Sequence, residues 1–546
     1  MKNKQFGTKL TATLALTFSS GEVVIPAGEW VSFGWELHPW GFEAEVVFRV
    51  ASGGNKHDKV FTDFIKPDLI IAELKVAAVT TKPTPEPEPV PLKGPVVFRG
   101  LEEEVSTEVK EAPVLVRTYR IGFTDPLAFY WTRHRPTRIY AKKSLTAVVE
   151  ENTPAGVTVK TELAAFDDVL PLITVGLGTP DNLTHQAYPA HFLDWVVTRL
   201  RHVQGHLLFD PVANSYTLAT AKPSDGDPTA LKEGDTGTAS VTFPEPPRHG
   251  VSLINGVSKD ARVEPVSNEN AATGIMEEIL IMEPVPKNVT TRKTLETSRL
   301  TPESMRVSLP FARFPETRLL CGSLVSLPSP EKTTKLITCK KVYRITAMSA
   351  TAQAPAPQTD AGTGCDQAFF SACLQVSLEA KEDTASRLPD ARPVPALFHV
   401  EGVIASDVGE ESEATYQVVR DTETAGDRYR VTLPAFDDLE IPALFAPDNL
   451  PSHLFFPLYK GTRALLALSL CSARIKGTVD WLGSTRVDQK AQSQRILFGK
   501  GEKSQVRLEH RYEEGKPVFE MERVMEKDGE RLTMEEGKMT WQVGES

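Results

Sequence analysis

The stretch Leu10-Thr-Ala-Thr-Leu-Ala-Leu-Thr-Phe18 alternates apolar side chains with small or polar ones along its whole length. A period of two places every second side chain on one face of an extended strand, whereas an amphipathic helix needs a period near 3.6. The preceding Met1-Lys-Asn-Lys resembles the charged start of a secretory signal only superficially, since no A-x-A cleavage site follows. We therefore predict a half-buried strand over residues 10–18.

Short alternating runs of the same kind recur over much of the chain, and they predict a mainly β protein with small α+β parts. Such runs occupy 45–50, 68–79, 96–99 and 114–122, and strand patterning returns from 249 to about 385. The 41 prolines among 546 residues exceed the usual frequency of about 5% and favour many edges and turns. The net charge of −11 argues against a protein that binds the phosphates of a nucleic acid.

Cysteine usage and hydropathy indicate the environment of the chain. The five cysteines form no C-x-x-C pair, and an odd number cannot pair completely within one chain, which favours assembly in a reducing compartment. No apolar run approaches the roughly 18 residues that a membrane-spanning helix requires.

Two segments carry helical patterns. Ser144 is a candidate N-cap for a short helix, with Leu145, Val148 and Val149 on one face. A longer helix is predicted from about His191 to Gln204, followed by Gly205 as its terminator and then by a hairpin over 206–218. The apolar stripe of this helix consists of Phe192, Trp195, Val196, Leu200 and Val203.

The last segment, 488–546, has very little apolar surface for each predicted strand. Its turns are predicted at Gly501, Gly515, Asp528-Gly529 and Gly537. Such strands cannot form a core alone, so we expect the tail to pack against copies of itself or another chain. The predicted packing residues are Val506, Leu508, Val518, Met521, Leu532 and Met534, and Met539, Trp541 and Val543 lie on one face of the final strand.

No catalytic, cofactor-binding or metal-binding residue is predicted. The polar cluster 131–138, with His202 and His206, lacks metal-ligand spacing, and we expect it to meet an acidic surface on a neighbouring subunit. The pairs Asp167-Asp168 and Asp437-Asp438 are expected to be turn or cap residues, because adjacent carboxylates on a strand point to opposite faces. No serine or cysteine lies in a nucleophile motif.

Several segments together resemble the VgrG-type spike proteins and phage baseplate hubs of contractile injection systems. In the first part these are Val96-Val-Phe-Arg-Gly100, Leu115–Leu127, Arg138-Ile-Tyr140 and His191–Leu200 with Gly205–Asp210. In the second part they are Gly402-Val-Ile404, Arg428–Pro434 and Phe455–Leu468, in the order of the family's OB-fold collar. Tyr140 stands where this family usually has Phe.

The resemblance implies a homotrimer with two hub β-barrel domains, an OB-fold collar and a short intertwined β-helix or prism spike in each chain. The predicted domains are 1–143, the first hub barrel with a Pro-rich loop at 81–95; 144–248, an α+β hub subdomain; 249–390, the second hub barrel; 391–487, the collar; and 488–546, the spike. The tail lacks the Val-Gly octad repeats of long phage needles, and no lysozyme-like insert separates hub from collar, so a short spike without cell-wall hydrolysis is expected.

The function implied is structural: a central hub-spike that caps the inner tube and pierces the target envelope when the sheath contracts. The implied partners are further copies of the chain, the inner tube protein, baseplate proteins, a PAAR-type tip protein docked on 537–546 and effector cargo, with no nucleic acid. The resemblance also implies that the protein assembles in the bacterial cytoplasm. It would be part of a phage tail, a type VI secretion system or an extracellular injection particle. The alternative is a tail-associated or secreted polysaccharide-degrading enzyme whose OB-like domain binds carbohydrate.

Overall fold

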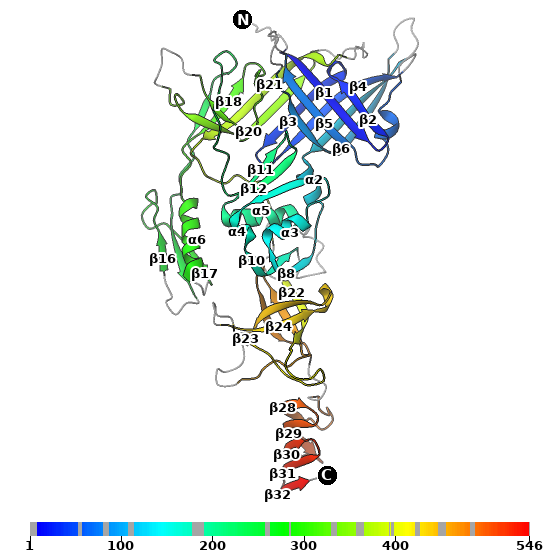
Figure 1. Ribbon diagram of the computed structural model, residues 1–546, viewed down its shortest axis with the longest axis vertical. Helices are drawn as coiled ribbons and strands as arrows, with labels where there is room; N and C mark the ends of the chain where they lie inside the picture. Colours follow the sequence, from blue (N-terminus) through cyan, green and yellow to red (C-terminus); the bar gives the residue numbers. More distant parts are fainter. Residues whose placement is uncertain are drawn as a thin grey trace. The chain divides into compact units, whose positions relative to one another are not determined.

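A computed structural model of the chain describes residues 8–52, 57–79, 87–106, 114–176, 190–256, 263–282, 286–328, 336–355, 365–392, 394, 398–420, 426–445, 455–480 and 486–544. It divides into two compact units (Figure 1). Unit 1 comprises 1–135, 149–167 and 190–393, and unit 2 comprises 136–148, 168–189 and 394–546. The domain boundaries inferred from the sequence stay predictions.

The N-terminal strands of unit 1 form the first part of a 13-stranded sheet. They are β1 (Thr8–Phe18), β2 (Gly21–Pro26), β3 (Trp30–His38), β4 (Gly41–Ser52), β5 (Ile71–Ala78), β6 (Val90–Ser106) and β7 (Val114–Thr124), with the short helices η1 (Ala27–Glu29) and α1 (Phe61–Phe64) between them. In β1 the five apolar residues Leu10, Ala12, Leu14, Leu16 and Phe18 are all buried. The predicted half-buried strand is confirmed.

Strands from a distant part of the chain complete this sheet. They are β13 (Thr229–Ala230), β14 (Ser240–Thr242), β18 (Arg306–Phe311), β19 (Leu324–Ser326), β20 (Val342–Gln353) and β21 (Gln367–Ala380). β21 pairs with β1, β20 pairs with β3, and β20 and β21 pair with each other. The strands of the two predicted hub barrels therefore share one hydrogen-bonded sheet, which closes on itself through β20 and β21.

The Pro-rich segment differs from its prediction as a loop over 81–95. Strand β6 begins at Val90 and pairs with β5 from Val90 to Pro95, so this part is strand. Over these residues β6 pairs with β5 alone, and its pairing with β7 begins at Val96. Proline is tolerated on such a free edge because no neighbouring strand needs its missing N–H group. Residues 87–89 lack regular secondary structure, as a loop requires, and residues 81–86 of the predicted loop lie outside the described residues.

A small α+β part of unit 1 contains the second predicted helix. Its elements are α2 (Pro126–Trp131), β9 (Thr158–Glu162), α4 (Ala164–Asp167), α5 (Phe192–Val203), β11 (His206–Asp210) and β12 (Ser215–Ala219). Helix α5 starts at the N-cap His191, whose side chain accepts a hydrogen bond from the Asp194 backbone. It ends at Gln204, which adopts the left-handed conformation (φ 51°) one residue before the predicted terminator Gly205.

A further helix in unit 1 has no counterpart in the sequence prediction. Helix α6 (Pro286–Arg299) packs on a three-stranded sheet of β15 (Gly250–Asn255), β16 (Val263–Val266) and β17 (Met276–Ile281). The strand pattern inferred for this region was wrong over these 14 residues. The helix is largely polar, and it buries only a small apolar contact around Val251, Leu253, Val266 and Leu300.

Unit 2 contains a closed five-stranded barrel, the strand number and closure expected for the predicted OB-fold. The barrel path runs through β22 (Phe398–Ala405), β24 (Asp427–Leu433), β25 (Leu439–Phe445), β27 (Ala473–Thr478) and β26 (Arg463–Leu468), with β23 (Val419–Arg420) at one edge and η2 (Pro434–Phe436) after β24. The antiparallel pair of β8 (Arg138–Ser144) and β10 (Val169–Val175) adds Ile139 and Leu172 to the barrel core.

Helix α3 (Leu145–Glu151) follows β8, and Ser144 Oγ accepts a hydrogen bond from the Ala147 backbone, so the predicted N-cap is confirmed. No helix in the described part of the chain is long and apolar enough to cross a membrane.

Candidate functional site: the C-terminal sheet

The last described residues of unit 2 form a sheet of five antiparallel strands, each paired only with its neighbours in sequence (Figure 1, red). The strands are β28 (Gln494–Gly501), β29 (Ser504–Glu513), β30 (Lys516–Met525), β31 (Asp528–Glu535) and β32 (Lys538–Gly544). Two-residue turns connect them, and a turn of that length fixes the register of the strands on either side. The register therefore determines which side chains share a face.

Of the four predicted turns, two are confirmed and two are displaced: Gly501 is the last residue of β28, directly before the turn at 502–503. Gly515 and Gly537 lie in turns with φ of 81° and 67°, a conformation that glycine adopts at little cost. Asp528 and Gly529, predicted as a turn, lie within β31 instead. The chain reverses two residues earlier, where Glu526 takes the left-handed conformation (φ 51°).

One face of this sheet, called here the apolar face, carries a row of large apolar side chains across all five strands. Leu508 pairs with Ile496 on one side and Met521 on the other, and the row continues through Leu532 to Trp541. Directly paired residues point to the same side of a sheet, so these five side chains lie together. The two flanking rows contribute Phe519, Met534 and Met539, and Phe498, Val506 and Val543.

Most of this apolar face is exposed to solvent in the single chain. Val506, Met521 and Met534 are each more than a third exposed. Exposure is greatest on β32, where Met539 is 67%, Trp541 71% and Val543 68% exposed. Soluble proteins seldom leave so continuous an apolar surface uncovered unless another molecule packs on it.

The opposite face carries charges that neutralise one another across the strands, and we call it the charged face. Arg507 binds Glu520 (3.0 Å) and Glu522 (2.6 Å), and Arg531 binds Glu522 (2.5 Å). Glu520 is only 2% exposed, and although burial alone would raise the pKa of its carboxyl, hydrogen bonds from Arg507 and Arg511 lower it below its ordinary value. The chain thus covers its charged face with its own arginine side chains.

The structure places five of the six predicted packing residues on the apolar face: Val506, Leu508, Met521, Leu532 and Met534. Val518 lies on the charged face, where it pairs with Arg511 and is buried. Its distance of three residues from Met521 explains the difference, because an odd spacing reverses the side of a strand. The three predicted docking residues, Met539, Trp541 and Val543, share the apolar face on the last strand.

The other polar groups identified in the sequence do not converge on a site. Trp131 Nε1 donates to the Asn152 carbonyl (3.0 Å), and a ring nitrogen of His134 lies 2.9 Å from the Asn152 side chain. Asp437 and Asp438 both have positive φ (53° and 56°), which confirms that they are turn residues. Among the described residues, no group of three His, Cys, Asp or Glu side chains could hold a metal ion.

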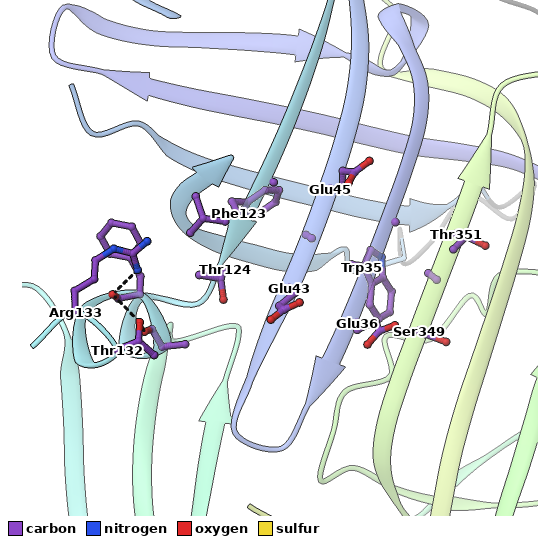
Figure 2. Close-up of a pocket in the computed structure, with 17 residues that line it drawn as sticks. Trp35, Glu36, Glu43, Glu45, Phe123, Thr124, Thr132, Arg133, Ser349 and Thr351 are labelled. Carbon is purple, nitrogen blue, oxygen red and sulfur yellow. Dashed lines mark hydrogen bonds between the residues drawn. The ribbon is translucent and has the colours of Figure 1, made fainter. Parts of the chain in front are cut away.

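A broad groove of about 630 Å³ lies on the 13-stranded sheet of unit 1 (Figure 2). Strand β3 contributes Trp35 and Glu36, and β4 contributes Glu43 and Glu45. The other lining residues come from the same two strands, from β6, β7 and β20, and from the region of α2. Arg120 binds the Glu45 carboxylate at 2.9 and 3.0 Å. Arg133 and Thr132 donate to backbone carbonyls of the α2 region, as the dashed lines show, so these donors are occupied within the chain.

Comparison with known proteins adds to this description at the level of structure. No protein-family model matches the sequence, and no curated protein matches it. A chain of the lidless PdpA–VgrG complex matches with a TM-score of 0.73 and 13% sequence identity, covering 100% of both chains. This protein has the fold of a VgrG-type spike protein.

Two further structures support the VgrG-type fold. A chain of the lidded PdpA–VgrG complex from Francisella matches with a TM-score of 0.72 and 14% identity, covering 99% of this chain and 81% of that one. The half-lidded Francisella complex gives 0.71 and 13%, with coverage of 99% and 89%. The resemblance seen in the sequence is thus confirmed, and the matches extend over the segments that carried no motif.

Proposed function

We propose that this chain is the central hub-spike protein of a contractile injection baseplate, which caps the inner tube and pierces the target envelope on sheath contraction. The observation that carries the proposal is the exposed apolar face of a C-terminal sheet, on a chain with the VgrG-type fold along its full length. The role is structural rather than enzymatic: the strands transmit force, and no chemical step is assigned to the chain.

The proposed assembly is a homotrimer. Three C-terminal sheets around a threefold axis form a prism in which the three apolar faces meet and the charged faces point to solvent. Burial of apolar surface contributes roughly 25 cal/mol per Å², so the rows through Met521 and Leu532 would drive this association. In this proposal the strands of the closed 13-stranded sheet supply two hub barrels in each chain. Six hub barrels in a trimer would match the end of a sixfold inner tube, and the five-stranded barrel would be the OB-fold collar.

The proposed tip lies on β32. This strand has an unpaired edge in the described sheet and carries the three most exposed residues of the apolar face, Met539, Trp541 and Val543. An exposed strand edge invites a partner that supplies the missing hydrogen bonds. A PAAR-type protein docked on 537–546 would cover this edge and provide a sharp point.

Charged replacement of Trp541 and Val543 is expected to abolish tip docking, because a charge in the apolar contact loses its hydration without gaining a partner. The measurement is a pull-down of a PAAR-type protein by the W541D/V543D variant, with T540D on the opposite face of β32 as the control. Retention of the tip protein by the double variant would contradict the proposal.

Further partners follow from the same proposal. The matched VgrG structures are complexes with a second protein, PdpA. We propose that this chain likewise carries a partner or effector protein, in addition to its contacts with the inner tube and baseplate proteins. Assembly in the bacterial cytoplasm, before ejection or release of the particle, belongs to the proposal and holds for a phage tail, a type VI system or an extracellular particle.

The full chain tests the proposal through mass and turnover. Three chains of 60.0 kDa give a particle of about 180 kDa, which sedimentation measures directly. The expected result is this trimer, retained by immobilised inner tube protein, with no release of sugar from peptidoglycan or capsule. A monomer that cleaves polysaccharide would overturn it and would establish the enzymatic alternative.

A further inference from the structure

A buried cluster of positive charges lies in unit 1. Lys222 Nζ (2.7 Å) and Arg344 Nη1 (2.9 Å) both bind the same oxygen of Glu379, and Arg387 Nε binds its second oxygen (2.9 Å). Glu379 is 1% exposed, and the Lys222 and Arg344 side chains are 8% and 5% exposed. Three cations therefore surround a single buried carboxylate.

The surrounding groups do not restore neutrality. Arg387 also binds Glu303 (3.1 Å), but Arg306 binds that same carboxylate (2.7 Å), so Glu303 is shared. Arg306 is 52% exposed, so the buried part of the cluster consists of the three cations Lys222, Arg344 and Arg387, which face Glu379 and the shared carboxylate of Glu303. A net positive charge at a buried position is costly unless an anion compensates it.

A small cavity opens beside this cluster. It has about 20 Å³ of space, enough for one water molecule or one ion of similar size. Its lining includes His206, Lys222, Arg344, Glu379 and Arg387, with the apolar side chains of Pro39, Leu208 and Ile345. The cavity is therefore small and partly enclosed, and the cations in its lining outnumber the carboxylates.

Two of the lining residues retain unused hydrogen-bond donors among the described residues. Lys222 has three N–H groups, and Glu379 accepts from it in one hydrogen bond. His206 is 4% exposed, and its ring makes no hydrogen bond within the described part of the chain. Burial and the charge of Lys222 lower the pKa of His206 to about 4, so the ring is neutral at pH 7 and has one N–H to donate.

We infer that this cavity binds a small monovalent anion of the size of chloride, held by the Lys222 ammonium and the His206 ring. The halide would accept hydrogen bonds from the unused N–H groups of Lys222 and His206, and its negative charge would balance the excess positive charge. Water has the right size but carries no charge, so it satisfies the donors only. The anion would connect β11, which carries His206, to β20 and β21, which carry Arg344 and Glu379.

The test compares the thermal unfolding of the full chain in sodium chloride, sodium bromide and sodium gluconate at equal ionic strength. Gluconate is too large for the cavity. We expect the two halides to raise the Tm of the native protein by about 2–4 °C relative to gluconate, because a ligand that binds only the folded state stabilises it. The same measurements are made on Lys222→Met and, as the control, on Lys232→Met, which alters an exposed ion pair with Glu316.

The difference between halide and gluconate should vanish in K222M and persist in K232M. If Lys222 only binds Glu379, its replacement in K222M should lower the Tm by the same amount in all three salts. The Tm difference between halide and gluconate would then persist in K222M, and this result would overturn the inference. A bromide-soaked crystal of the native protein provides a second measurement. An anomalous peak within about 3.5 Å of Lys222 Nζ supports the site, and its absence shows that the cavity holds water.

Discussion

The buried carboxyl group of Asp125 is a single residue with a measurable effect on pH dependence. Asp125 Oδ1 accepts hydrogen bonds from Tyr216 Oη (2.6 Å) and the Ala128 backbone (2.9 Å). Burial nevertheless raises the pKa of Asp125 to about 6, above its ordinary value of 3.8. The folded state therefore binds more protons than the unfolded state between about pH 4 and pH 6.

It follows that the contribution of Asp125 to the free energy of unfolding should fall by about 2–3 kcal/mol as the pH rises through this window. Asp125→Asn has no charge to acquire, so the free energy of unfolding of the native protein should fall relative to that of the variant as the pH rises, whatever the absolute stability of the variant. Denaturant unfolding between pH 4 and pH 7 measures both slopes, with the exposed Asp225→Asn as the control. An unchanged slope in D125N would contradict the assignment.

Gly402, on β22 of the five-stranded barrel, illustrates the packing of a single position. A Cβ atom there would lie 2.5 Å from Val431 Cγ1 and 3.1 Å from Leu466 Cδ1, two residues of the barrel core. Gly402→Ala should destabilise the barrel by roughly 1–3 kcal/mol, the usual cost of overpacking. Thermal unfolding measures this loss, and Gly477→Ala, with no atom within 4 Å of its added Cβ, should leave Tm nearly unchanged. Equal Tm values for the two variants would show that the core accommodates the methyl group.

At the scale of elements, the two faces of the C-terminal sheet predict opposite responses to charge. Met521→Lys places an ammonium group in the middle row of the apolar face and should weaken trimerisation at least tenfold, with little effect on the folding of the single chain because Met521 is 43% exposed. Thr533→Lys, on the charged face, is the matched control. Sedimentation equilibrium measures both variants, and equal association would place the interface elsewhere.

The elements that the sequence predicted well are those whose pattern is local. Strand β1 and helix α5 each repeat a period that determines their buried face, and Trp195 is buried as its stripe required. Helix α6 was missed because threonines and charged residues dominate it, and several of its threonine hydroxyls bind backbone carbonyls one turn earlier. Such residues give no repeat of apolar side chains at the spacing of a helix, so the sequence pattern does not reveal the helix.

The candidate site was predictable in outline for the same reason. A spacing of two residues, as between Val506 and Leu508, predicts that both side chains lie on one face of a strand, and this prediction does not depend on where the turns are. The position of Val518 could have been predicted from its odd spacing to Met521. The displaced turn at 526–527 depends on a backbone conformation that residue types alone do not determine. The pairing of β1 with β21 joins residues more than 350 positions apart, and no local pattern contains that information.

At the scale of the whole molecule, removal of 488–546 should separate folding from assembly. Within the described residues, the C-terminal sheet pairs with no other sheet, whereas the closed sheet of unit 1 and the five-stranded barrel have buried cores. The truncated chain is therefore expected to keep its cooperative thermal unfolding but to trimerise more weakly. Analytical ultracentrifugation and calorimetry test the two halves of this prediction, and an unchanged trimer affinity would refute the role of the tail.

The pairing of β1 with β21 has a consequence for the chain during its synthesis. Phe370 leaves the ribosome some 360 residues after its partner Thr8, a delay of roughly 20–70 s at 5–20 residues per second. Through that interval one edge of the nascent sheet lacks its native neighbour, and open edges promote aggregation. A chaperone that shields β1 until β21 emerges would raise the yield of this protein, and slow codons placed before residue 367 would lower it.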